Sequence, residues 1–439
     1  MANTYLNRTS IGTPTNRKKF TGSAWVKRAR ASANEAIIWT GSDSNNWTMF
    51  KFSTTNLVVQ FRNSSSDVVF LETDRVFRDP SAWYHIVVSV DTTQSTSSDR
   101  VKLYVNGVQE TSFSTATYPS QNLDLDTTTE QKIGLQHTTQ YFDGEMSHVH
   151  FIDGTAYDAS AFGSTDATTG EWVGKTSPSV TYGTNGFFIL KDGNGITDQS
   201  GEGNDFTLGG GTLTDLKDNP DNVFATINPL DKDLTGTAAT ISYGNTRFSS
   251  SGNSSSNNGM RCTLGASSGK YYWEVKNVQN DLLLGIQDAD ATTRFTSSWT
   301  WGLTGTYAVK SNGDKSINVT QTSNAVPTFT TGDTLMLAMD LDNQKLYFGK
   351  NGTWSNSGDP TSGSTGTGSL GNLVSGATYI PVVSNASWSQ NTIADFNFGN
   401  GYFGTTAVSS AGTNASDNGI FEYDVPTGYT ALSTKGLNL

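Results

Sequence analysis

The stretch Gly332–Trp354, GDTLMLAMDLDNQKLYFGKNGTW, decides the fold class of this chain. From 335 to 341 leucine or methionine occupies every second position, which is the pattern of a β-strand with one buried face. Asp340 and Asp342 fall on the other side, which we expect to face solvent. A second apolar strand ends at Asn351-Gly352, a pair that tolerates the positive φ angles of a tight type I′ turn. The stretch therefore predicts a β-hairpin that packs on a core.

The composition of the whole chain supports an all-β class. Its 439 residues include 45 glycines, and 34% are hydrophobic, as expected for many short strands joined by polar turns. No long segment has the apolar periodicity of an amphipathic helix. A chain of this length suits two or three domains, each large enough to bury a core.

The hairpin at 332–354 resembles the core hairpin of SPRY (B30.2-like) domains, which are concanavalin-like β-sandwiches that bind partners through their loops. Other segments resemble further parts of that domain: GKYYWEVKN (269–277), LLLGI (282–286), SSWTWGLTGTYAVKSNGDK (297–315) and DFNFGNGYF (395–403). The resemblance implies an SPRY-like domain over residues 236–404. The residues 405–439 that follow are then expected to form a C-terminal tail.

The first half of the chain contains a second hairpin of the same kind, WYHIVVSVD (83–91) followed by VKLYVNG (101–107). Together with FDGEMSHVHFIDGTAYD (142–158), it resembles laminin-G-like, concanavalin-type lectin domains. The resemblance implies a lectin-like domain over 1–195 and a connector over 196–235. The predicted fold is all-β, with two concanavalin-like antiparallel β-sandwich (jelly-roll) domains in tandem, a β-rich connector and a C-terminal tail.

Three phrases are similar to phrases in structural proteins of marine tailed phages: LNRTSIGTPTNRKKFTGSAWVKR (6–28), DNVFATINPL (221–230) and FEYDVPTGYTALSTKGLNL (421–439). The resemblance implies a virion protein, either a fibre or a surface appendage. Its expected partners are a host cell-surface glycan or protein and other virion subunits, and the expected assembly is a homo-oligomer. A purely structural decoration or connector protein of the virion is the alternative.

The formal net charge of −12 argues against nucleic acid as a partner, because phosphate contacts need clustered Lys and Arg. Basic residues do cluster before Glu35, the first acidic residue. They form either a solvated strand edge or a docking surface for an acidic partner. The cluster comprises Arg8, Arg17, Lys18, Lys19, Lys27, Arg28 and Arg30.

Targeting signals and disulfides are not expected. The N-terminal residues lack the apolar core of a signal peptide, and no apolar run reaches about 18 residues. We therefore expect synthesis in the host cytoplasm, a place in the virion and no membrane insertion. Cys262 is the only cysteine, so an intrachain disulfide cannot form.

An enzyme is the third interpretation, because concanavalin-like sandwiches include retaining β-glucanases. Such enzymes need two carboxylates roughly 5 Å apart, commonly on one strand as Glu-x-Asp-x-x-Glu. The nearest match is Glu72-Thr-Asp74-Arg-Val-Phe77, where Phe77 occupies the position of the second glutamate. Phenylalanine cannot act as a general acid, so we expect no catalytic residues and no enzyme.

Metal binding stays open at the level of sequence, and we assign no metal ligand or cofactor. His148 and His150 lie two residues apart on a predicted strand, so both rings can share one face or simply pack. Asp and Asn side chains can supply oxygen ligands for Ca²⁺, although they also favour tight turns. The candidates are Asp143 with Asp153, and Asp192, Asn194 and Asp198.

Aromatic residues in loops rich in Gly, Ser and Asn are the candidates for ligand binding. Flat rings stack on sugar faces and neighbouring amides bond to hydroxyls, but the same rings also pack at the rim of a sandwich. Trp301 and Tyr307 resemble framework positions of the SPRY family, so we expect Trp299 and Trp47 to be the exposed rings. The predicted ligand-binding residues are Asn45, Trp47, Trp299, Trp301 and Tyr307.

Overall fold

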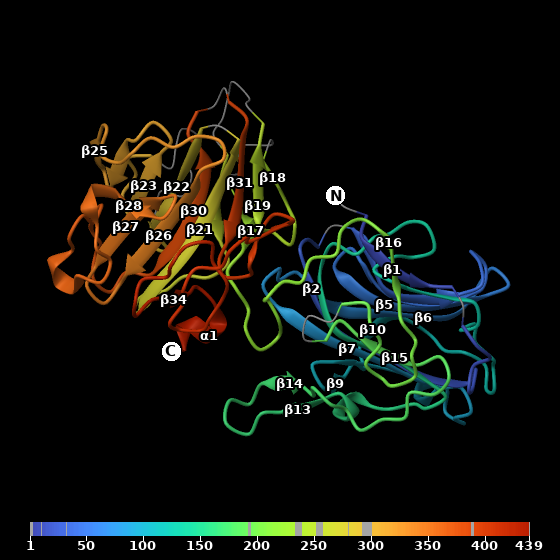
Figure 1. The fold of residues 1–439 in the computed structure, drawn as a ribbon. Helices are drawn as coiled ribbons and strands as arrows, with labels where there is room; N and C mark the ends of the chain where they lie inside the picture. Colours follow the sequence, from blue (N-terminus) through green and yellow to red (C-terminus); the bar gives the residue numbers. More distant parts are fainter. Residues whose placement is uncertain are drawn as a thin grey trace. The chain divides into compact units, whose positions relative to one another are not determined.

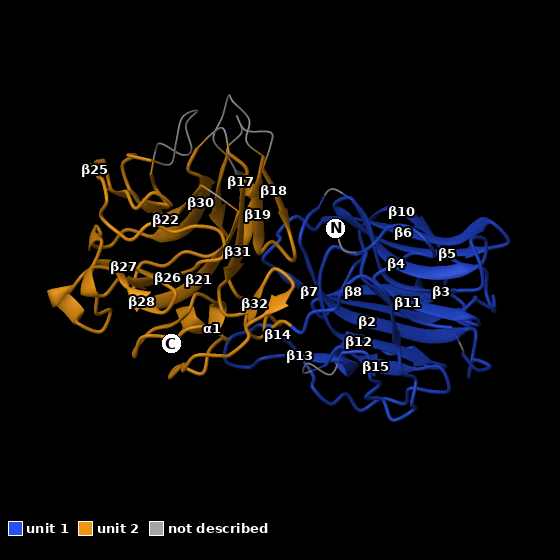
Figure 2. Ribbon diagram, turned by 45° about the horizontal axis from the view of Figure 1, so that its top comes forward, with its two compact units in different colours: residues 1–215 blue, residues 216–439 orange. Residues whose placement is uncertain are grey.

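A computed structural model describes residues 3–9, 11–31, 33–191, 195–232, 239–251, 258–279, 281–291, 301–387 and 390–438. The chain divides between Asp215 and Leu216 into two compact units (Figure 2). Each unit is built from β-sheets whose strands pair mainly antiparallel (Figure 1). The predicted all-β class with two sandwiches is therefore confirmed.

In the part of the chain that the structure describes, the first unit has an eight-stranded and a six-stranded sheet, with one separate hairpin. The order in the larger sheet is β10 (Phe113–Thr117), β6 (Ser66–Val76), β5 (Asn56–Asn63), β4 (Trp47–Ser53), β3 (Asn34–Gly41), β11 (Glu130–Ile133), β1 (Tyr5–Arg8) and β16 (Thr207–Gly210). The order in the smaller sheet is β15 (Phe187–Ile189), β12 (Gly144–Asp153), β2 (Lys19–Arg28), β7 (Trp83–Asp91), β8 (Val101–Val105) and β9 (Val108–Gln109). The hairpin consists of β13 (Gly163–Thr165) and β14 (Trp172–Gly174).

The inner faces of these two sheets form the core of the first unit. Phe20 of β2 lies 5.8 Å from Phe61 of β5 and 5.6 Å from Phe151 of β12, measured between ring centroids. At Gly22 a Cβ atom would lie 2.1 Å from the Phe50 ring, so glycine at this position lets the sheets approach closely. Alternating apolar residues on each strand thus produce a closed sandwich.

The predicted hairpin at 83–107 is present as β7 and β8, which pair antiparallel with Val88 opposite Leu103. The chain turns from β8 into β9 at Asn106 and Gly107, whose φ angles are +48° and +80°. Two consecutive positive φ angles are the conformation for which the Asn-Gly pair is suited. The short-range sequence signal therefore identified this element correctly.

The second unit has a seven-stranded and a nine-stranded sheet among its described residues. The first runs β17 (Ile227–Lys232), β20 (Gly259–Cys262), β30 (Tyr379–Asn385), β22 (Leu282–Asp288), β23 (Thr306–Lys310), β24 (Lys315–Ile317) and β25 (Thr320–Thr322). The second runs β18 (Ala239–Ser242), β19 (Arg247–Ser250), β31 (Thr392–Asn397), β21 (Lys270–Gln279), β26 (Thr334–Asp340), β27 (Lys345–Lys350) and β28 (Thr353–Trp354). Outside this path, β27 also pairs with β29 (Gly371–Asn372), and β21 pairs in parallel with β34 (Thr430–Ala431).

Short elements complete both units. A two-stranded hairpin is formed by β32 (Tyr402–Phe403) and β33 (Thr406–Ala407), and α1 (Thr434–Leu437) is a single helical turn. Single 3₁₀ turns lie at Ser97–Asp99, Ala159–Ala161, Ser355–Ser357 and Gly363–Thr365.

The decisive stretch 332–354 forms β26, β27 and β28, and its Asn351-Gly352 turn has φ angles of +49° and +82°. One detail of the prediction is wrong. Asp340 does not face solvent: it is 0% exposed and pairs with Lys270 at 3.1 Å between Oδ2 and Nζ. All seven residues of β26 are buried, so this strand is covered on both faces.

Residues 196–235, expected to form a connector, contribute strands to both units. In the first unit, β16 pairs with β1, and in the second, β17 pairs with β20. Both segments therefore complete sheet edges, where their backbone groups find partners.

The expected C-terminal tail is integrated into the second unit. The Ala225 amide donates to the Leu432 carbonyl at 2.9 Å, and the Thr434 amide donates to the Val223 carbonyl at 2.9 Å. The segments 221–230 and 421–439 thus lie side by side.

Candidate functional site

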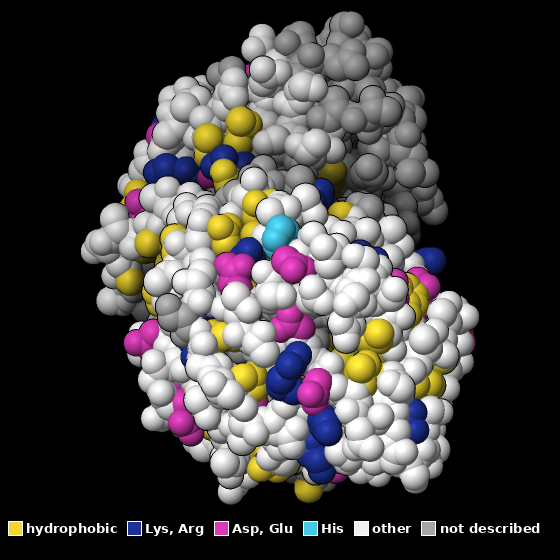
Figure 3. Space-filling model, turned by 90° about the vertical axis from the view of Figure 1, so that its right-hand side faces the viewer, with side chains coloured by type: hydrophobic (Ala, Val, Ile, Leu, Met, Phe, Trp, Pro, Cys, Tyr) yellow, Lys and Arg dark blue, Asp and Glu magenta, His cyan; other side chains and the backbone are white. Residues whose placement is uncertain are grey.

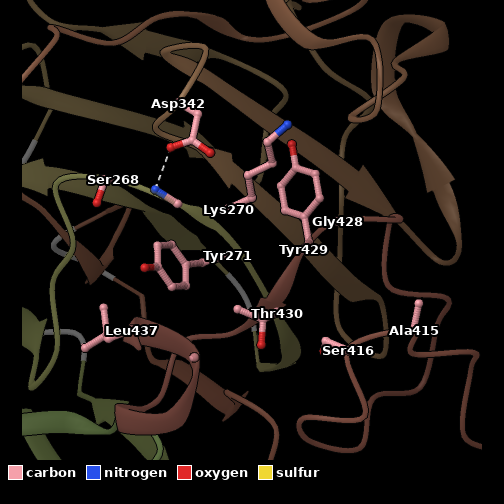
Figure 4. Close-up of a pocket in the computed structure, with 12 residues that line it drawn as sticks. Ser268, Lys270, Tyr271, Asp342, Ala415, Ser416, Gly428, Tyr429, Thr430 and Leu437 are labelled. Carbon is pink, nitrogen blue, oxygen red and sulfur yellow. Dashed lines mark hydrogen bonds between the residues drawn. The ribbon is translucent and has the colours of Figure 1, made fainter. Parts of the chain in front are cut away.

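A pocket with a volume of about 500 Å³ lies in the second unit, where three segments meet (Figure 4). These are the beginning of β21, the turn between β26 and β27, and the C-terminal segment. The lining includes Ser268, Tyr271, Asp342, Ser416, Thr430 and Leu437. In Figure 4, Tyr271 lies between Asp342, from the turn between β26 and β27, and Leu437, from the C-terminal segment.

Strand pairing fixes the polar wall. The Gly269 amide donates to Asp342 Oδ1 at 2.8 Å, and the Leu341 amide donates to the Gly269 carbonyl at 2.9 Å. Gly269 has a φ of +87°, which a residue with a side chain adopts only with strain. The carboxylate of Asp342 is thereby held at the edge of the pocket.

The opposite wall comes from the C-terminal segment. Thr430 of β34 stands beside Tyr271 in the parallel pairing with β21. The side-chain amide of Asn418 donates to Thr430 Oγ1 at 2.8 Å and to Ser433 Oγ at 3.1 Å. Ser433 also caps α1 by accepting from the Gly436 amide at 3.0 Å. These bonds hold the C-terminal segment against the sheet.

A buried carboxylate fastens the same segment further along β21. Glu274 Oε1 accepts from the Tyr272 hydroxyl at 2.9 Å and from the Tyr423 amide at 2.8 Å. Its Oε2 accepts from the Glu422 amide at 2.8 Å. Burial raises the pKa of Glu274 to about 7, although these hydrogen bonds favour the charged form. One side chain therefore holds residues that lie 148 positions away.

The sequence prediction did not find this pocket. Asp342 was noted only as a polar residue on a strand, and Tyr271 and Ser268 were not singled out. A usable signal exists for Glu274, which interrupts the apolar run YYWEV and therefore requires buried hydrogen-bond partners.

The predicted ligand residues of the first unit make contacts within that unit. Trp47 is only 2% exposed, and its indole nitrogen donates to the Ser44 carbonyl at 3.0 Å. The Arg62 guanidinium lies 5.3 Å from the centre of its ring. The expectation of an exposed ring is therefore wrong for Trp47, because a neighbouring strand covers it. Asn45 is exposed and accepts from the Ser65 hydroxyl at 2.9 Å.

The predicted ligand residues of the second unit face different sides of β23. Tyr307 is 2% exposed and packs edge-on against Tyr379 in the core. Trp301 is half-buried on the other side, where Lys310 Nζ lies 4.0 Å from its ring centre and Gln321 accepts from its indole nitrogen at 2.7 Å. Trp299 lies outside the described residues. Ligand binding by this residue set stays a prediction.

The glucanase-like motif on β6 does not form a pair of catalytic carboxylates. Phe77, at the position of the second glutamate, is 1% exposed and packs against Phe52 and Tyr84 in the core. Glu72 is half-buried and Asp74 is exposed. The strand therefore presents no acid/base partner at the required position.

A serine–histidine pair that the sequence did not indicate occurs in the first unit. Ser23 Oγ lies 2.9 Å from His85 Nε2, and the Trp172 indole donates to His85 Nδ1 at 2.9 Å. Because Nδ1 accepts, the ring proton is on Nε2, which donates to Ser23. Burial lowers the pKa of His85 to about 3. This histidine cannot take a proton from Ser23, so the pair is not a nucleophile with its base.

The predicted metal candidates are engaged in other contacts. His150 Nδ1 lies 3.0 Å from the Tyr182 hydroxyl, and a register shift in β12 between Ser147 and His150 interrupts the shared face with His148. Asp153 accepts from the Thr15 amide at 2.8 Å. Within the described ranges, no group of three or more His, Cys, Asp or Glu side chains is arranged to hold a metal ion. Asp192 and Asn194 lie outside those ranges.

The basic N-terminal cluster is largely paired within the unit. Ion pairs join Lys19 to Asp91 and Arg30 to Asp143, both at 3.1 Å, and Arg28 is buried against Glu35. Figure 3 shows one face of the molecule, on which basic and acidic side chains are interspersed among neutral polar surface.

Comparison with known proteins found one family model that is similar to part of the first unit. Residues 2–161 match the family model Laminin_G_3, described as the concanavalin A-like lectin/glucanases superfamily. No curated protein sequence matches the chain. Residues 2–161 are therefore similar to concanavalin A-like lectin domains.

Solved structures are similar to part of the chain. The SPRY domain of human HERC1 has 17% identity and a TM-score of 0.31, covering 39% of this chain and 96% of that one. The PSpry domain of TRIM65 has 14% identity and a TM-score of 0.28, covering 39% and 91%. Stonustoxin has 18% identity and a TM-score of 0.28, covering 39% and 27%. In the chain as described, no helix is long and apolar enough to cross a membrane.

Proposed function

We propose that this chain is a non-enzymatic adhesion protein that binds host surface glycans or proteins as a fibre or surface appendage of a tailed-phage virion. The observation that carries the proposal is the lectin-family match over residues 2–161. Loops on a rigid sandwich are suited to recognition, since they vary without disturbing the core.

Two further observations support the finer parts of the proposal. The carboxylate motif on β6 is incomplete, with Phe77 in the core, which favours binding over glycan cleavage. The phage-like phrases at 221–230 and 421–439 pack together in one module, as expected if they were inherited together.

Binding of the labelled full chain to a panel of marine bacteria tests the proposal. We expect saturable adsorption to some strains, competed by the purified surface polysaccharide or by removal of surface protein. Reducing-sugar release from that polysaccharide at catalytic turnover would contradict the non-enzymatic assignment. Incorporation into virions without any adsorption would favour the structural connector instead.

A further inference from the structure

We propose that the pocket beside Tyr271 binds a neutral, hydroxyl-rich saccharide unit. This inference rests on the proposed adhesive function. It states where on the chain the ligand binds and which class of ligand it is. The pocket volume of about 500 Å³ falls within the range of about 300–1,000 Å³ that is usual for small-molecule sites.

The first argument is that hydrogen-bonding groups remain unused in the pocket. Asp342 uses Oδ1 to accept from the Gly269 amide at 2.8 Å. Its Oδ2, the Tyr271 hydroxyl and the Ser268 hydroxyl make no hydrogen bond to another residue that the structure describes. A carboxylate that accepts beside hydroxyls that both donate and accept can bind adjacent hydroxyl groups of a sugar.

The phenol of Tyr271 stays available as a donor. Burial, and in second place the negative charge of Asp342, raises the pKa of Tyr271 above its ordinary value. The phenol is therefore protonated at any physiological pH. A ligand hydroxyl can accept from Tyr271 while it donates to Asp342, which is an arrangement that a charged acceptor such as phosphate cannot reproduce.

The charge balance of the pocket disfavours acidic ligands. The ammonium group of Lys270 is paired with Asp340 at 3.1 Å between Nζ and Oδ2. The carboxylate of Asp342 therefore remains the uncompensated charge, and it repels phosphates, sulfates and acidic sugars. Neutral saccharides do not meet this repulsion.

An apolar surface completes the site. Leu437 is 37% exposed at the pocket wall and supplies this surface, whereas Tyr271 is only 4% exposed and contributes chiefly its hydroxyl (Figure 4). The C–H face of a sugar ring is apolar, so it packs on such a surface while its hydroxyls reach the polar wall. Leu437 thus offers an apolar contact to the C–H face of a sugar, while Asp342 and the hydroxyl groups of the lining face its hydroxyls.

The experiment uses the full chain on an array of neutral and acidic oligosaccharides, followed by titration of the best neutral ligand. Asp342→Asn keeps an oxygen that accepts from Gly269 but removes the charge, and Ser268→Tyr fills the pocket. Each is expected to weaken binding about tenfold or more, with an unchanged Tm. Asp290→Asn and Ser410→Tyr, at exposed positions outside the lining, are the matched controls and should bind normally.

Three results would overturn the inference. If the chain binds neutral glycans and both pocket variants bind them equally well, the site lies elsewhere and the adhesive function stands. If the full chain binds neither glycans nor host surfaces, the proposed function fails first. If Asp342→Asn abolishes binding of a lysine-bearing protein but of no saccharide, the pocket serves a protein partner.

Discussion

Each unit contains a glutamate that is completely buried, but the partners of the two carboxylates differ. One partner is a cation and the others are uncharged donors. Glu35 in the first unit pairs with the Arg28 guanidinium, whose Nε and Nη2 both lie 2.8 Å from Oε2. Glu274 in the second unit has neutral donors, namely Tyr272 and the amides of Glu422 and Tyr423. In both cases burial raises the pKa of the carboxyl group to about 7.

The difference shows two uses of one residue type. Glu35 and Arg28 are 7 positions apart on neighbouring parts of the chain, so their ion pair stabilises local structure. Glu274 binds a segment 148 positions away, so it determines where the C-terminal residues lie. Removal of Arg28 would leave the Glu35 carboxylate buried without its cation. Removal of the Glu274 side chain would leave uncharged donors buried without an acceptor.

The largest effect is expected for Arg28→Met, which leaves the Glu35 carboxylate buried without its cation. The free energy of unfolding should fall by about 3–5 kcal/mol in urea titration. The pair of Lys102 and Asp99 at the surface provides the control, since Lys102→Met should change stability by no more than about 1 kcal/mol. If both variants lose the same free energy of unfolding, burial does not make the Arg28–Glu35 pair more important than the surface pair.

The pH dependence of stability is the next largest effect. Both carboxyl pKa values are raised on folding, so the folded protein binds protons more tightly than the unfolded chain. The resulting stability is fully present below about pH 4.5 and is lost as pH rises through about 7, by up to about 3 kcal/mol per group. Glu35→Gln and Glu274→Gln should each flatten part of this slope in urea titrations from pH 5 to 8. If the free energy of unfolding depends on pH equally with and without these two substitutions, other titrating groups cause that dependence.

A smaller loss, about 1–3 kcal/mol, is expected for Glu274→Ala, which leaves buried donors without an acceptor. Limited proteolysis should also cut residues 405–425 sooner, because their attachment to β21 is weakened. Glu422→Ala keeps the backbone bond to Glu274 and loses only the 2.9 Å contact with Thr334. If Glu274→Ala is cleaved no faster than Glu422→Ala, Glu274 does not hold the segment.

The smallest effect is expected for Lys270→Met, about 1 kcal/mol in unfolding free energy. Asp340 would lose its ion pair but keep the amide and side-chain donors of Asn343, both at 2.9 Å. A small loss would show that neutral donors stabilise the buried Asp340 carboxylate, as they do at Glu274. A loss near that of Arg28→Met would instead show that the cation holds Asp340.

The fold was predictable because strand periodicity is a local signal. The hairpins at 83–107 and 332–354 show their alternation and their Asn-Gly turns within about twenty residues. The structure places these signals where the sequence located them. Domain-scale pairing, such as β16 with β1, joins residues about two hundred positions apart and leaves no such local pattern.

The site was less predictable because burial depends on distant segments. Trp47 follows a polar turn, yet Arg62 and Met49 cover its ring. The pocket at Tyr271 exists only because residues 415–437 return to β21. Neither fact can be inferred from residue type and spacing alone, whereas a lone glutamate in the apolar run YYWEV does indicate a buried polar contact.

The pairing between residues 223–225 and 432–434 has a mechanical consequence. The two segments run antiparallel, with Asn222 and Lys435 at the same end. A pull that separates these two residues loads the hydrogen bonds one after another, as in opening a zipper, rather than all together in shear. The C-terminal segment, including β34, should therefore peel away at low force while the other strands of both sheets hold, and the wall of the Tyr271 pocket would leave with it.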